Sequence, residues 1–255
     1  MTKIHFRSGD GLDLVGILDE PKAKTNACII LCHGFRLNKD ESGNFIALAA
    51  RLAASGFAVF RFDFRAHGES EGEPVDLTLT GEKEDLEAAF KFLTNKGYSN
   101  FGIVAASFSA GSVALFIPAH QEHFKALALL YPRLDFNGFI KKRWLAGGQK
   151  ELLAKQEFVY YKDFRVGKKL VEEMLKIHPI EELKKLRMPI LFVHGDKDQS
   201  VPYEESVSYA KILNSKLVTI KGSGHGFFDN EQDLAQAVGA VDDFFIENLS
   251  ASNKL

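Results

Sequence analysis

Cysteine is scarce in this chain, with two residues in 255, and both lie in one apolar segment. Cys28 and Cys32 are four residues apart, so an extended strand would separate their Cα atoms by about 13 Å. A disulfide needs Cα atoms within about 7 Å of each other. We therefore expect two buried thiols, which suits a reducing compartment and predicts a cytoplasmic location.

An excess of charge of one sign is also absent. The 32 Lys and Arg residues nearly balance the 34 Asp and Glu residues, and the net charge is −2. This balance predicts no nucleic-acid partner. No apolar run approaches the roughly 20 residues that cross a membrane, so we expect no membrane span. Residues 1–7 lack the apolar segment of a secretion signal.

Patterns typical of metal and cofactor sites are sparse as well. His120 and His123 are three residues apart, but no Glu or Cys follows at a matching spacing. The glycines at positions 222 and 224 form too short a stretch for a phosphate-binding or dinucleotide-binding loop. The sequence therefore predicts no metal and no organic cofactor.

Apolar residues, in contrast, make up 45% of the chain and occur in short runs that alternate with longer amphipathic segments. The expected strands are residues 3–7, 12–19, 27–32, 58–62, 101–106, 126–131, 189–194 and 216–220. The expected helices are residues 45–55, 82–95, 109–116, 203–213 and 234–249. This alternation predicts an α/β fold, a mostly parallel sheet with helices on both faces, in a single domain of residues 1–255.

Residues 133–188 interrupt the alternation. This segment shows no convincing strand pattern, holds 14 basic and 8 acidic residues, and is rich in aromatic side chains, Trp144 among them. We predict a helical lid or cap insertion that follows the sixth strand and covers the functional site. The alternative is that its aromatic residues form a small core of their own and its charges face solvent.

Ser107 is the best candidate for a nucleophile. It lies between the expected strand 101–106 and the helix that follows, where a sharp turn would expose its hydroxyl. The N–H of Phe108 could then stabilise a developing oxyanion. Ser109 is a competing nucleophile two residues further on, and a third interpretation makes the serine the cap of an inert helix.

The segment His33, Gly34, Phe35 directly follows the expected strand 27–32. Loops at the carboxyl ends of parallel strands face the ligand crevice, so the Phe35 N–H can supply a second oxyanion donor and its ring a wall of the acyl pocket. We expect a structural, hydrogen-bonding role for His33. The neighbours of His67 suggest a hydrogen-bonded loop, so we expect a structural role for this histidine too.

A serine nucleophile needs a base and a carboxylate that orients the base. His225 lies between two glycines after the last expected strand, which suits a catalytic base on a flexible loop. Asp198 follows the strand 189–194 and is the preferred acid. Spacing alone leaves Asp196 and Asp135 open as alternatives.

These segments resemble an α/β-hydrolase of the serine esterase type, similar to cinnamoyl (feruloyl) esterases and to monoacylglycerol-lipase-like enzymes. The order serine, acid, histidine is typical of that superfamily, and the resemblance runs from Ile4 to about Leu249. It implies an eight-stranded sheet with the second strand antiparallel. It also implies that Asp198, the second Asp of a Gly-Asp-x-Asp stretch, is the acid. The usual Gly-x-Ser-x-Gly motif is altered, because Ala105 and Ser109 replace its glycines.

The expected function is hydrolysis of a small-molecule carboxylic ester through an acyl-enzyme. Ser107, Asp198 and His225 would form the catalytic triad, and the Phe35 and Phe108 amides the oxyanion hole. Phe35, Phe108 and Trp144 are expected to contact the substrate and to favour an apolar or aromatic acyl group.

The altered Gly-x-Ser-x-Gly motif would form the sharp turn at Ser107, here called the elbow. Its alteration supports an alternative from another class, a catalytically silent hydrolase scaffold that binds a small ligand or a partner protein. An amide substrate is open on the same machinery. The sequence also leaves the oligomeric state open, a homodimer included.

Overall fold

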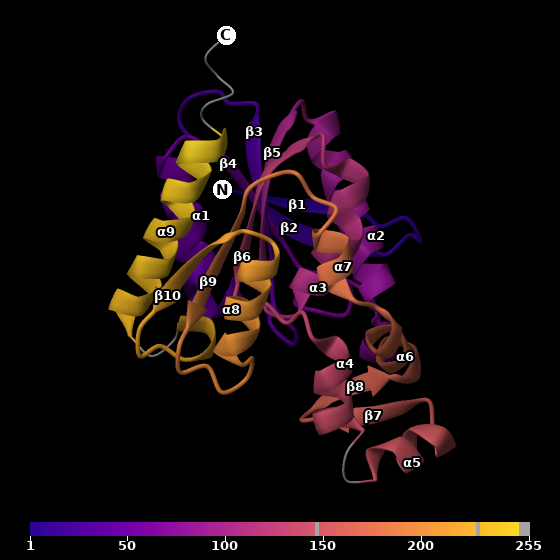
Figure 1. The fold of residues 1–255 in the computed structure, drawn as a ribbon. Coiled ribbons are helices and arrows are strands. Elements are labelled where there is room, and N and C mark those ends of the chain that lie inside the picture. Colours follow the sequence, from indigo (N-terminus) through magenta and orange to yellow (C-terminus); the bar gives the residue numbers. More distant parts are fainter. Residues whose placement is uncertain (146–147, 228–229, 250–255) are drawn as a thin grey trace.

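The computed structural model describes residues 1–145, 148–227 and 230–249. Its centre is one eight-stranded sheet in the order β1-β2-β4-β3-β5-β6-β9-β10 (Figure 1). The strands are β1 (Thr2–Arg7), β2 (Asp13–Asp19), β3 (Ala27–Cys32), β4 (Ala58–Phe62), β5 (Asn100–Ala106), β6 (Phe124–Leu130), β9 (Ile190–Gly195) and β10 (Lys216–Ile220). β2 is antiparallel to both of its neighbours, and the pairs from β4 to β10 are parallel. The predicted fold class is confirmed, and so is the antiparallel second strand.

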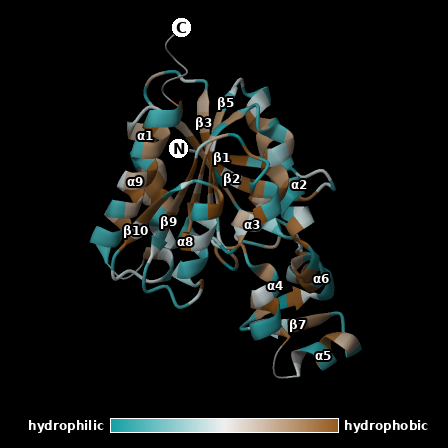
Figure 2. Ribbon diagram, in the orientation of Figure 1, coloured by the Kyte–Doolittle hydropathy of each residue, from teal (hydrophilic) through white to brown (hydrophobic). Residues whose placement is uncertain are grey.

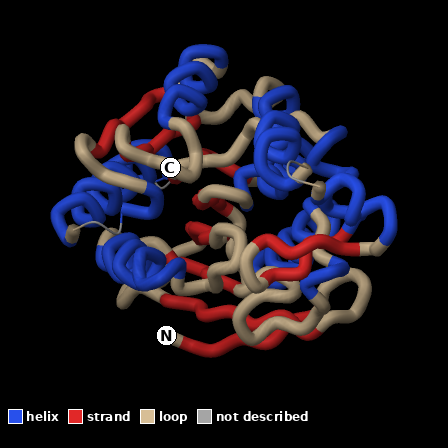
Figure 3. Tube along the Cα trace, turned by 90° about the horizontal axis from the view of Figure 1, so that it is seen from below, coloured by secondary structure: helices blue, strands red, loops and turns tan. Residues whose placement is uncertain are grey.

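Helices cover both faces of this sheet, as Figure 3 shows from below. One face carries α1 (Asn44–Ala54) and α9 (Glu231–Leu249). The other carries α2 (Leu79–Asn95), α3 (Ser109–Phe116), α7 (Pro179–Leu183) and α8 (Tyr203–Ile212). Figure 2 shows the apolar strands at the centre and mixed hydropathy along the helices. The layers explain why β3 is apolar along its whole length and why the other central strands are mostly apolar.

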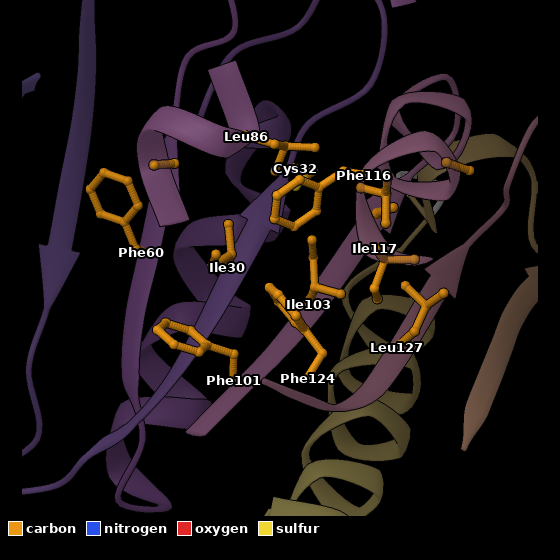
Figure 4. Packing of buried hydrophobic residues seen from close by; sticks show 14 of the residues in the cluster. Ile30, Cys32, Phe60, Leu86, Phe101, Ile103, Phe116, Ile117, Phe124 and Leu127 are labelled. Atoms are coloured by element: carbon orange, nitrogen blue, oxygen red, sulfur yellow. The ribbon is translucent and has the colours of Figure 1, made fainter. Parts of the chain in front are cut away.

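The alternation of side chains along β3 divides the core in two. Ile29 and Leu31 pack under α1 and α9, whereas Ile30 and Cys32 pack under α2 and α3 (Figure 4). Cys28 lies on the same face as Cys32, and both thiols are free and buried. Two buried faces on one strand leave no polar position, which is why residues 27–32 form a continuous apolar run.

The segment between β6 and β9 is not all helical, and that part of the prediction is wrong. It contains α4 (Phe136–Phe139), a π-helical turn (Ile140–Trp144), α5 (Gln149–Lys155), the antiparallel pair β7 (Phe158–Tyr161) and β8 (Phe164–Gly167), and α6 (Lys168–Lys176). Figure 1 shows these elements together at the lower right. Lys162 adopts a positive φ of 57° in the two-residue turn of this hairpin, and aromatic side chains favour its short strands.

The insertion, residues 133–188, has a small core of its own that continues into the main body. Val159, Val166 and Leu170 pack in one cluster with Phe108, which follows the elbow serine. A side chain at Gly167 would collide with the Val75 carbonyl oxygen, at 1.9 Å, so β8 lies directly against the body. Within the described residues, every helix is too short or too polar to cross a bilayer.

Candidate active site

Ser107 occupies a sharp turn between β5 and α3. Its φ is 53°, in the left-handed region that a non-glycine residue rarely adopts. The turn is held by neighbouring backbone: the Ser107 N–H donates to the Leu130 carbonyl at 2.9 Å, and the Arg133 N–H donates to the Ser107 carbonyl at 2.9 Å. The serine side chain is left half-buried at the edge of a pocket.

The competing serine has a different environment. Ser109 is fully buried at the start of α3, and its hydroxyl lies 2.8 Å from the Cys32 carbonyl oxygen and 3.0 Å from that of Ala106. The same hydroxyl accepts the Ala106 N–H at 3.1 Å. Where the usual motif has glycine, this side chain ties the elbow to the end of β3. A hydroxyl enclosed in this way cannot meet a substrate.

His225 and Asp198 are brought into contact by loops that follow β10 and β9. The Nδ1 of His225 lies 2.6 Å from Oδ2 of Asp198. The other carboxylate oxygen, Oδ1, accepts the N–H groups of Ser200 at 2.7 Å and Val201 at 2.8 Å. Because the carboxylate accepts at Nδ1, the Nε2 of His225 is left with the lone pair that a base requires.

A second histidine shares the same carboxylate. The Nε2 of His194 lies 3.0 Å from Asp198 Oδ2, and its Nδ1 lies 2.7 Å from the Ser206 hydroxyl. Burial alone would raise the pKa of Asp198, but the hydrogen bonds from His194 and His225 lower it below its usual range. The aspartate is therefore ionised at neutral pH.

The other acids considered from the sequence serve loops and helix ends. Oδ1 of Asp196 accepts the Gly222 N–H at 2.6 Å, which holds the loop before His225. Oδ1 of Asp135 accepts the Gly138 N–H at 2.8 Å and caps α4. Neither contact involves His225, so the geometry favours Asp198 among the three.

Ser107 and His225 line the same pocket. In the part of the chain that the structure describes, no hydrogen bond joins the Ser107 hydroxyl to the His225 ring. Catalytic hydrogen bonds are often long in the absence of substrate and tighten in the complex. The His225 side chain is 27% exposed, so a molecule in the pocket can reach its ring.

The loop that contains Phe35 is held by two buried histidines. The Phe64 N–H donates to Nε2 of His33 at 3.0 Å, so Nδ1 carries the hydrogen and donates to the Gly34 carbonyl at 2.9 Å. In the same way, the Arg36 N–H donates to Nε2 of His67 at 3.1 Å. Burial lowers the pKa of both rings, which keeps them neutral. His33 and His67 therefore have the hydrogen-bonding environments expected of structural residues.

Aromatic and basic side chains form the walls of the pocket. The Phe35 ring lies 5.1 Å from that of Phe108 and 4.7 Å from that of Phe164, between ring centroids. The Arg133 guanidinium lies 4.0 Å from the centre of the Phe139 ring, and both residues line the pocket. The insertion thus contributes directly to the site. Trp144, expected to contact the substrate, has a side chain outside the described part of the structure.

Sequence reasoning missed two residues that contact the site. His194 lies next to the last residue of β9, four residues before Asp198, and Tyr131 follows β6 with its ring 4.7 Å from that of His225. The position of each at the carboxyl end of a central strand was a usable signal. Within the described ranges, no group of three His, Cys, Asp or Glu side chains has the arrangement of a metal site.

Comparisons with known proteins agree with this architecture. Est1E from Butyrivibrio proteoclasticus, solved with ferulic acid bound, is 27% identical and superposes with a TM-score of 0.86 over 96% of this chain and 99% of that one. An acyl transferase from Shewanella hanedai is 34% identical over 227 residues, 82% of this chain and 71% of the relative. An acyl transferase from Vibrio campbellii is 38% identical over 86 residues, which are 33% of this chain and only 27% of that relative.

Family models cover most of the chain. Residues 23–155 match the model described as serine aminopeptidase, S33, and residues 172–249 match the model described as TAP-like protein. The first match alone spans just over half of the sequence and includes Phe35 and the elbow at Ser107. Together with the sheet order and the likeness to Est1E, these matches show that the chain belongs to the serine aminopeptidase S33 family of α/β-hydrolases.

Proposed function

We propose that this chain is a carboxylesterase in which Ser107 is the nucleophile, His225 the general base and Asp198 the acid that orients the base. The observation that carries the proposal is the 2.6 Å contact between Asp198 and His225 Nδ1 beside the strained elbow serine. The bond holds the imidazole in the tautomer that can take a proton at Nε2. Backbone strain at a pocket edge is common where a site is pre-organised.

The reaction begins when His225 Nε2 accepts the Ser107 proton and the serine oxygen attacks the ester carbonyl. The Phe35 and Phe108 N–H groups stabilise the oxyanion. His225 then gives its proton to the departing alcohol, and the serine keeps the acyl group. Water repeats the sequence, with His225 again as base, and releases the carboxylic acid and the free serine.

The pocket walls favour an apolar or aromatic acyl group. Phe35, Phe108, Phe139 and Tyr161 all line the space around Ser107, and aromatic walls offer a flat acyl group large contact areas. In this proposal residues 133–188 act as the lid that supplies half of these walls. The likeness to Est1E, which was solved with ferulic acid bound, supports the same preference.

Acyl transfer is the second candidate, favoured by the relatives named acyl transferases. The same acyl-enzyme would form, and an acceptor alcohol or thiol in place of water would take the acyl group. Product analysis with an added alcohol separates the two outcomes, because transfer gives a new ester whereas hydrolysis gives only the acid.

The direct test is fluorophosphonate labelling with mass mapping, together with turnover of p-nitrophenyl esters. We expect the label on Ser107, and turnover that Ser107→Ala removes. A label on another serine, or equal turnover in the variant, would refute the assignment of the nucleophile. A chain that takes no label and cleaves no ester or amide would instead be the silent scaffold.

A further inference from the structure

A buried carboxyl group that the proposed reaction does not use lies directly behind the Phe35 loop. Glu41 is 1% exposed and begins a 3₁₀ turn (Glu41–Gly43) between that loop and α1. Its Oε2 accepts the Gly34 N–H at 2.7 Å, and its Oε1 accepts the Tyr131 hydroxyl at 3.1 Å. The side chain thus contacts two elements that border the candidate catalytic residues.

The hydrogen bond from the Gly34 N–H to Glu41 helps to set the direction of the next amide, that of Phe35. The peptide group between Gly34 and Phe35 is trans, so its C=O and its N–H point in opposite directions. The His33 ring holds the C=O of that group, while Glu41 holds the N–H of the preceding one. With both sides of Gly34 anchored, the direction of the Phe35 N–H is set.

The glycine itself is closely packed. A Cβ at Gly34 would lie 3.2 Å from Glu41 Oε1 and 3.3 Å from the Ser107 Cβ. Gly34 is therefore sandwiched between the carboxyl group and the elbow. Movement of the Glu41 side chain would change the position of the Phe35 amide relative to Ser107.

The second contact reaches the histidine. The Tyr131 ring packs edge-on against His225, with 4.7 Å between centroids, and its hydroxyl is held by Glu41. The side-chain amide of Asn44, three residues after Glu41, donates to the Gly226 carbonyl next to His225. One short segment thus supports both the expected oxyanion donor and the expected base.

This segment is kept at a cost in stability. Three consecutive residues have left-handed φ values, 44° at Glu41, 53° at Ser42 and 99° at Gly43. Burial raises the pKa of Glu41, and the hydrogen bonds from Gly34 and Tyr131 offset only part of this effect, so that the pKa is about 7. Strained backbone and a buried ionisable group at one position are more typical of a functional site than of a simple turn.

We propose that Glu41 is a positioning residue that aligns the Phe35 amide with the substrate carbonyl and, through Tyr131, supports His225. The inference rests on the proposed esterase function. In this role Glu41 helps to stabilise the tetrahedral transition state, where the oxyanion forms. It does not affect the affinity for the ester in its ground state.

The test compares Glu41→Gln with Glu41→Leu, using p-nitrophenyl butyrate and a trifluoromethyl ketone that adds to the serine as an oxyanion. The glutamine keeps an oxygen for the Gly34 N–H, so we expect activity within a few-fold of wild type. The leucine removes that acceptor at similar size. We expect kcat and kcat/KM to fall together by about 10²-fold, as for a misplacement near 1 Å, and ketone affinity to fall by a similar factor.

Glu82 provides a matched control, because it is also a buried carboxyl, 2% exposed, and it contacts Ser112 and not the pocket. Glu82→Leu should change the melting temperature without changing kcat/KM or ketone affinity. If Glu41→Leu does not fold, Glu41→Asp carries the same prediction, because the shorter side chain withdraws the acceptor from Gly34.

Two failures can be told apart. A wild-type chain that shows neither turnover nor labelling at Ser107 refutes the esterase proposal itself. An active wild type whose Glu41→Leu or Glu41→Asp variant keeps full kcat/KM and ketone affinity refutes only the role of Glu41. Equal losses in the Glu41 and Glu82 variants would also refute it, since they would reflect general destabilisation.

Discussion

Replacement by alanine should have different effects at the two serines of the elbow. At Ser109 it should lower stability, and at Ser107 it should remove activity. The Ser109 hydroxyl is fully buried, with two carbonyl oxygens and one N–H within hydrogen-bonding distance. Leaving buried polar groups unsatisfied costs about 1–3 kcal/mol each, so Ser109→Ala should lower the free energy of unfolding by about 2–4 kcal/mol. For a domain of this size that corresponds to a melting temperature lower by about 4–16 °C.

Ser107→Ala should change activity and leave stability nearly unchanged. Its hydroxyl is half-buried at the pocket edge, and alanine adopts the left-handed φ no less readily than serine does. We expect the free energy of unfolding to stay within about 0.5 kcal/mol of wild type, while ester turnover disappears. Ser109→Ala, assayed well below its melting temperature, should keep most of its turnover.

Calorimetry and a p-nitrophenyl ester assay on the two variants test whether Ser109 is structural and Ser107 is the nucleophile. Loss of turnover in Ser109→Ala with an unchanged melting temperature would show that the buried serine takes part in the reaction. The opposite failure, full turnover in Ser107→Ala, would remove the basis of the proposed mechanism.

Three further predictions concern charge. Asp198→Asn should lower kcat by about 10⁴-fold, because the amide no longer selects the His225 tautomer; a loss below tenfold in steady-state kinetics would contradict the role of Asp198. Burial raises the pKa of Glu82 to about 8, partly offset by the Ser112 hydrogen bond. The folded state therefore binds this proton more tightly than the unfolded state, and the free energy of unfolding should fall between about pH 4.5 and 8. Urea titrations should show that Glu82→Gln flattens this dependence, and an unchanged slope would contradict it. Arg133→Gln should lower kcat/KM for an ester with a carboxylate on its leaving group by about fivefold relative to a matched neutral ester; an unchanged ratio would mean that Arg133 does not sense substrate charge.

The sheet could be predicted from the sequence because burial on both faces leaves a clear pattern. β3 is apolar at every position, and its prediction as residues 27–32 matches the observed strand. The hairpin was missed because β7 and β8 have only four residues each. Such short segments alternate too few times for a period of two to stand out from an aromatic-rich helix.

The positions of the candidate site residues could be predicted in part for a related reason. Ser107, Asp198 and His225 each follow a strong strand, and chain order relates them. Glu41 lies in a polar stretch with Lys39 and Asp40 that is typical of an exposed loop. Its burial depends on contacts with Gly34 and Tyr131, and the latter is 90 residues away in the chain. No local pattern encodes such a pairing.

The shared packing around Phe108 has a consequence for how substrate range can diverge. The insertion leaves the sheet after β6 and returns at β9, two strands that pair with each other, so its length can vary without disturbing the hydrogen-bond ladder. Its core, however, includes the residue directly after the elbow serine. In the proposed esterase, substitutions in this core would alter both the pocket wall and the surroundings of the Phe108 amide, so selectivity and turnover should change together.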